Sequence, residues 1–83
     1  MNKLIIINYI NKLTKNDIIT YCQKSSIPIT EDELDIIYYY IKNKHKEFLN
    51  GYDKQILEEI KYKVKSATYN KILELYNKYK DKL

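Results

Sequence analysis

The strongest constraint on this chain is the helix start that follows its only proline, Pro28. Proline fixes its own φ and pushes the preceding residue, Ile27, into an extended conformation, so no helix runs through this point. Thr30 then has the properties of an N-cap, and Glu33, three residues later, completes the pattern of a capping box. In that arrangement each side chain binds the backbone N–H of the other residue. The sequence therefore predicts that a helix begins directly after Thr30.

The predicted helix is apolar on two faces. One stripe carries Leu34, Ile37 and Ile41, and the second carries Ile36, Tyr39 and Tyr40. A helix that is apolar on both sides is usually buried between other elements, so we expect it to be the central helix of the domain. The alternative is that the second stripe is exposed to solvent and binds a partner.

The scarcity of turn-forming residues favours helices in the rest of the chain as well. One Gly and one Pro leave little of the chemistry that hairpins need. A chain of 83 residues with 45% hydrophobic residues is sufficient for one domain, which we expect to span residues 1–83. We predict an all-α protein, a compact bundle of about five short helices. The predicted helices span about residues 3–12, 15–23, 31–43, 51–64 and 68–80.

Two of these helices rest on particular patterns. Leu13–Ile18 repeats the order of residue types found in Ile29–Leu34, which predicts a second capped helix start. Residues 3–12 contain the strand-like run Leu4–Ile7. The chain offers no second strand for it, however, and an isolated strand leaves its backbone groups unpaired. A helix is therefore the better interpretation of residues 3–12.

The charge of the chain suggests a second class of function. The net charge is +4, with −1 in residues 1–41 and +5 in residues 42–83, and every basic residue is Lys. Lys, Asn, Ile and Tyr all have AT-rich codons, so coding bias accounts for this composition without a basic binding surface. The alternative is weak, nonspecific and salt-sensitive nucleic-acid binding by the basic half, without the Arg that most often reads guanine. The candidate contacts are Lys42, Lys44, Lys46, Lys61 and Lys65.

Residues suited to catalysis or metal binding are few. Cys22 and His45 are the only classical nucleophile–base pair, and Cys22 lies on an apolar helix face, as a buried and unreactive thiol does. One His and one Cys are too few for a structural metal site. The acids that follow Thr30 are explained by the helix dipole, and one Gly leaves no phosphate-binding loop. We expect no enzymatic activity, no metal and no cofactor.

The chain also shows no strong targeting signal. Leu4–Ile7 is apolar but lacks a cleavage site of small residues, and no segment approaches the roughly 20 apolar residues of a membrane span. A single cysteine suits a reducing compartment. We therefore expect a cytoplasmic protein that does not contact a membrane.

Several short patterns along the chain carry a resemblance to a known family. They are Ile10–Thr14, Tyr21, Ile27–Thr30, Lys42–Lys46, Phe48–Asn50 and Ser66–Thr68. Over nearly its full length the chain resembles the YqfT-like family of small uncharacterised proteins from Gram-positive, spore-forming bacteria. The resemblance implies a small bacterial helical protein, and it transfers no site because the family has no established function.

A second resemblance is local. The segment from Leu13 to Cys22, followed by Ile27–Ile29 and Leu34, is similar to the helix–extended–helix of SAP-type DNA-binding modules. At Thr30–Glu33 the chain has acids where such modules favour Gly and Lys. Negative charge at that position opposes a phosphate contact.

These observations favour a binding function. The leading hypothesis is a non-enzymatic protein that binds another protein, or a second copy of itself, through the apolar face formed by Ile36, Tyr39 and Tyr40. Nucleic-acid binding through the lysines of the basic half is the alternative. The identity of the partner, the pathway and the oligomeric state do not follow from the sequence.

Overall fold

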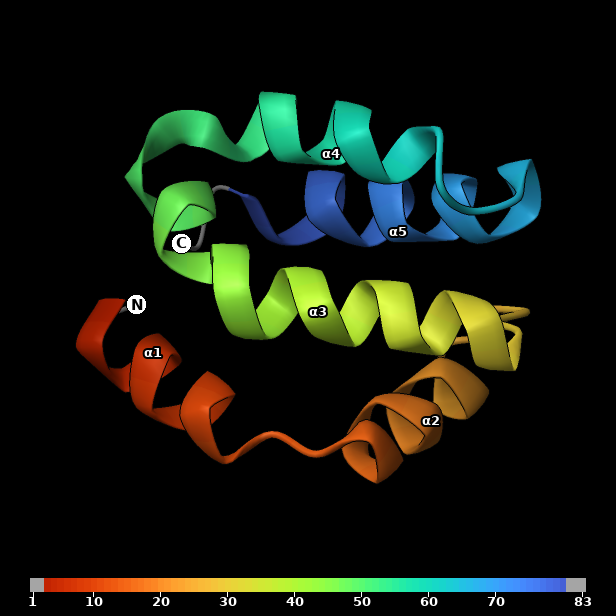
Figure 1. The fold of residues 1–83 in the computed structure, drawn as a ribbon, viewed down its shortest axis with the longest axis horizontal. Helices are drawn as coiled ribbons and strands as arrows, with labels where there is room; N and C mark the ends of the chain where they lie inside the picture. The colour runs from red at the N-terminus through yellow and green to blue at the C-terminus, as the bar shows by residue number, and fades with distance from the viewer. Residues whose placement is uncertain (1–2, 81–83) are drawn as a thin grey trace.

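The computed structural model describes residues 3–80, and the regular structure in this range is entirely helical (Figure 1). The elements are α1 (Lys3–Lys12), α2 (Lys15–Lys24), α3 (Glu31–Glu47), the π-helical turn η1 (Phe48–Tyr52), α4 (Asp53–Lys61) and α5 (Ser66–Tyr79). The prediction of an all-α bundle is confirmed. In Figure 1, α3 lies in the middle, with α1 and α2 on one side and α4 and α5 on the other. No helix within residues 3–80 is long and apolar enough to cross a membrane.

Both predicted capping boxes are present. Thr30 Oγ1 accepts from the Glu33 N–H at 3.3 Å, and Glu33 Oε1 accepts from the Thr30 N–H at 3.0 Å. At the start of α2, the corresponding distances between Thr14 and Asp17 are 3.2 and 2.9 Å. The hydrogen bonds explain why α2 and α3 begin where the sequence predicts them to begin.

The end of α2 shows why the connection to α3 is short. Ser26 adopts a left-handed conformation with φ 56°. Its N–H donates to the Gln23 carbonyl, and the Ile27 N–H donates to the Cys22 carbonyl at 2.9 Å. This is the Schellman pattern, which satisfies the last carbonyls of a helix and reverses the chain. Ile27 and Cys22 are both buried, so the reversal also places Ile27 in the core.

The carboxylate of Glu33 joins α3 to α5. Besides its role at Thr30, it accepts from the Lys65 N–H at 2.7 Å, from Lys65 Nζ at 2.7 Å and from the Thr68 hydroxyl at 2.9 Å. Lys65 is the N-cap of α5, and its own side chain does not cap the helix. Glu33 therefore supplies the acceptor that the first turn of α5 needs.

This environment changes the acidity of Glu33. Burial works to raise the pKa of the carboxyl group, because the side chain is 7% exposed. The hydrogen bonds from the side chain and backbone of Lys65, the backbone of Thr30 and the hydroxyl of Thr68 outweigh burial and lower the pKa to about 2. Glu33 is thus ionised at neutral pH although it is buried.

The hydrophobic core consists of two clusters that share α3. The first contains Ile18, Cys22, Ile27 and Leu34, between α2 and α3, and the second contains Ile37, Tyr40, Ile56 and Ile60, between α3 and α4. Half-buried side chains of α5 pack against both clusters, Leu75 against the first and Ile72 against the second. α3 thus contributes buried residues to both clusters.

The connection from α3 to α4 differs most from the prediction. α3 continues to Glu47 instead of ending near residue 43, and α4 spans Asp53–Lys61 instead of 51–64. Gly51 has φ 107°, which no helix accommodates, so α4 cannot begin there. The lysines of residues 42–46 do not end α3; they occupy its last turns, where positive charge suits the helix dipole.

Replacement of Glu33 tests the connection between α3 and α5. We expect Glu33→Gln to lower the free energy of unfolding near pH 6 by about 3 kcal/mol, the amount that the lowered pKa implies. Because the folded state favours the ionised form, this contribution is complete above about pH 5 and is lost as the pH falls toward 2. Urea unfolding of both proteins at several pH values measures the difference.

The matched control is Glu58→Gln, at an exposed position of α4. We expect this variant to change the free energy of unfolding by less than about 0.5 kcal/mol. An equal difference between wild type and Glu33→Gln at pH 6 and pH 2 would contradict the role assigned to the ionised carboxylate.

Replacement of Gly51 tests the turn in η1. A Cβ at this position meets no atom within 4 Å, so the cost of Gly51→Ala comes from the backbone alone. We expect about 1–2 kcal/mol of destabilisation, the cost of a left-handed conformation for a residue with a side chain. Thermal and urea unfolding measure it. Ser26→Gly is the control, because Ser26 also has a positive φ, which Gly adopts without strain. A loss of stability in this variant as large as that of Gly51→Ala would be inconsistent with this account.

Candidate functional site

The structure places the three residues of the predicted protein interface in different environments. Tyr40 is 7% exposed and belongs to the second core cluster, and Ile36 is half-buried against the same cluster. Tyr39 is 53% exposed, and its ring meets the Tyr40 ring edge to face, with 5.5 Å between the centroids. Two of the three residues of this stripe thus pack in the second core cluster, so the stripe does not form one exposed face. Binding of a partner by Tyr39 stays a prediction.

The five candidate lysines are also not equivalent. Lys42 Nζ donates to the carbonyls of Ile10 and Asn11 at 2.9 and 3.0 Å, so it supplies hydrogen bonds to two of the last carbonyls of α1. Lys65 binds Glu33, as described above, and the Pro28 carbonyl. Lys44 is half-buried, whereas Lys46 and Lys61 are exposed. Two of the five ammonium groups thus have a structural role within the domain.

A cavity lies between the two core clusters and is the most distinctive site in the described part of the chain. Its volume is about 480 Å³, and its lining includes residues from both clusters, such as Cys22 and Tyr40. α1 and α2 form one side, through residues such as Ile10, and α5 contributes Leu75 to the other. Apart from Asp17, Lys44 and His45, every lining residue is aliphatic, aromatic or Cys22. The cavity is therefore an apolar site with a few polar groups.

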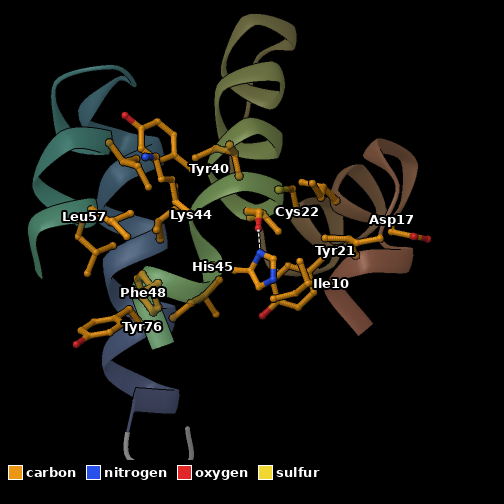
Figure 2. Close-up of a pocket in the computed structure, with 18 of the residues that line it drawn as sticks. Ile10, Asp17, Tyr21, Cys22, Tyr40, Lys44, His45, Phe48, Leu57 and Tyr76 are labelled. Carbon is orange, nitrogen blue, oxygen red and sulfur yellow. Dashed lines mark hydrogen bonds between the residues drawn. The ribbon is translucent and has the colours of Figure 1, made fainter. Parts of the chain in front are cut away.

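His45 projects from α3 into the middle of this lining (Figure 2). Its Nδ1 lies 2.7 Å from the carbonyl oxygen of Ile41, one turn earlier in the helix. The residue is only 8% exposed, and Nε2 has no hydrogen-bond partner among the described residues. Figure 2 shows the ring between Ile10 on one side and Phe48 on the other. The lining of this apolar cavity thus includes a residue with a buried polar atom that has no partner among the described residues.

The other polar groups of the lining do not form a catalytic site with His45. Burial raises the pKa of the Cys22 thiol, which keeps the thiol protonated and poorly nucleophilic at neutral pH. Asp17 is held by the capping box of α2, and in Figure 2 its carboxylate points away from His45. No group of three or more His, Cys, Asp or Glu side chains within residues 3–80 is arranged to hold a metal ion.

Sequence reasoning did not assign His45 to a site, although a signal was present. The predicted helix ended at about residue 43, which would have left His45 outside it. The first stripe of α3 continues beyond Ile41, however, because His45 and Phe48 follow at spacings of four and three residues. Residues at this spacing share one helical face. That periodicity would have predicted a buried His45.

Comparisons with known proteins add no family to this description. No protein-family model matches the chain, and neither the curated proteins nor the solved structures include a significant match. The resemblance to the YqfT-like family and the local similarity to SAP-type modules stay predictions.

The role of Lys42 can be tested apart from any nucleic acid. Lys42→Met keeps the apolar stem and removes the ammonium group that binds the last carbonyls of α1. We expect the α1 amides to exchange with solvent about tenfold faster, which corresponds to a loss of about 1.4 kcal/mol in the local opening free energy. Hydrogen exchange followed by NMR measures this. The control is Lys46→Met, at an exposed position. Equally faster exchange of the α1 amides in both variants would rule out this role of the Lys42 ammonium group.

Proposed function

We propose that this protein is a non-catalytic binding protein that takes up a small, largely apolar molecule in the cavity between the two core clusters. The observation that carries the proposal is the combination of an apolar cavity with a buried imidazole nitrogen, Nε2 of His45, that has no hydrogen-bond partner among the described residues. A binding function without catalysis is also what the composition of the chain favours.

The size and lining of the cavity support this proposal. Binding sites for small molecules typically enclose about 300–1,000 Å³ and are mostly apolar, with a few polar groups that fix orientation. The cavity of about 480 Å³ has this character, with His45 as its most buried polar residue. The cavity is partly open to solvent, so a small molecule can enter it from the surface.

The two functions expected from the sequence have less support. The apolar face proposed for protein binding retains only Tyr39 as a strongly exposed residue. The lysines proposed for nucleic acid include two that serve the fold, Lys42 and Lys65. Each therefore stays a prediction, and the cavity supports small-molecule binding better.

A purely apolar probe tests the proposal. We expect 2-methylnaphthalene to produce saturable changes in the amide NMR spectrum of the full chain, centred on residues that line the cavity. Ile10→Trp fills part of the cavity and is expected to weaken binding at least tenfold, because the added ring occupies the space of the ligand. Leu75→Phe fills it from α5 and provides a second variant.

The matched control is Ile5→Trp on the same helix. Ile5 is 62% exposed and does not line the cavity, so the same substitution leaves binding unchanged. Circular dichroism establishes that each variant is folded. The proposal is wrong if neither 2-methylnaphthalene nor its hydroxyl analogue 2-naphthol causes a saturable change, or if Ile5→Trp weakens binding as much as Ile10→Trp.

A further inference from the structure

The geometry of His45 points to the chemical class of the ligand. Resting on the proposed function, we propose that the ligand is a neutral apolar molecule with one hydroxyl group, an alcohol or a phenol, and that this hydroxyl donates a hydrogen bond to Nε2 of His45. The proposal follows from the tautomer of the imidazole, from its burial and from the direction of the neighbouring charges.

The tautomer is set by the backbone of α3. Nδ1 lies 2.7 Å from the Ile41 carbonyl oxygen, and a carbonyl oxygen only accepts hydrogen bonds. Nδ1 must therefore carry the proton. In a neutral imidazole the other nitrogen then has a lone pair and acts as an acceptor. Nε2 of His45, a residue of the cavity lining, is thus an acceptor and not a donor.

This acceptor is costly to bury without a partner. Nε2 has no hydrogen-bond partner among the described residues, and the whole residue is 8% exposed. A buried polar atom that lacks a hydrogen bond reduces the stability of the folded state. A ligand with a hydroxyl group at this point satisfies the acceptor, whereas a ligand without a donor leaves it unpaired. The cavity therefore discriminates in favour of a donor.

The charges around the cavity favour a neutral ligand over an acid. In Figure 2 the nitrogen of Lys44 points toward the side of Tyr40, and the carboxylate of Asp17 points away from the imidazole. A carboxylate ligand at Nε2 would need a second proton on His45, and the resulting ion pair would be removed from water in an apolar site. The desolvation of both charges commonly exceeds their attraction. A hydroxyl group makes the hydrogen bond without that cost.

Three probes of similar shape separate these possibilities. We expect 2-naphthol to bind the full chain about three- to tenfold more tightly than 2-methylnaphthalene at neutral pH, the range that one net hydrogen bond provides. We expect 2-naphthoate to bind more weakly than 2-naphthol. On addition of 2-naphthol, the nitrogen-15 resonance of Nε2 is expected to move in the direction of a hydrogen-bonded acceptor, while Nδ1 keeps its proton.

A variant of His45 completes the test. His45→Phe keeps a ring of similar size and removes the acceptor, so 2-naphthol is expected to lose its advantage over 2-methylnaphthalene. If this variant does not fold, the Nε2 resonance of the wild-type protein decides the matter. Equal affinities of the wild type for 2-naphthol and 2-methylnaphthalene, tighter binding of 2-naphthoate, or an unchanged Nε2 resonance would overturn the inference.

The failure of this inference is distinguishable from that of the proposed function. If 2-methylnaphthalene binds in the cavity and 2-naphthol has no advantage, the binding function stands and the hydroxyl class is wrong. If neither compound binds, both are wrong. Binding of 2-naphthol alone supports the inference, because it shows that the donor is required.

Discussion

The carboxylate of Glu33 is the interaction on which the arrangement of the helices depends. It accepts hydrogen bonds from the N–H of Thr30 at the start of α3 and from the N–H of Lys65 at the start of α5. It also accepts a hydrogen bond from the hydroxyl of Thr68, in the first turn of α5. Thr68 is fully buried, so this polar contact lies inside the domain. A charge in such a place is stable only while its donors are in position. The carboxylate therefore specifies how α5 packs on α3, in addition to stabilising the two helix starts.

The arrangement around α3 also explains the cavity. α1 and α2 make their contacts with α3, while α4 contacts both α3 and α5. Two hydrophobic clusters form in this way on one shared helix, and the space between them is lined from both sides. The stripe of α3 that builds the core continues to His45. The same helical periodicity that packs Ile37 and Ile41 in the core thus places a polar ring in the apolar site.

The features that the sequence predicted correctly are local ones. The capping boxes at Thr14 and Thr30 depend on residues three positions apart, so their chemistry is readable along the chain. The helical content and the central position of α3 follow from periodicity and composition. The contacts between Glu33 and Lys65 join residues 32 positions apart, and no local pattern contains them. The cavity likewise results from how the helices pack, which propensity does not determine.

The loose attachment of α1 has a kinetic consequence. None of its residues is fully buried, and its last carbonyls are held by Lys42 of α3. Such an element opens locally at a free energy well below that of global unfolding. Because α1 forms one wall of the cavity, each local opening exposes His45 while both core clusters stay packed. Such an opening takes place on the microsecond-to-second scale of local motions, far faster than unfolding of the domain.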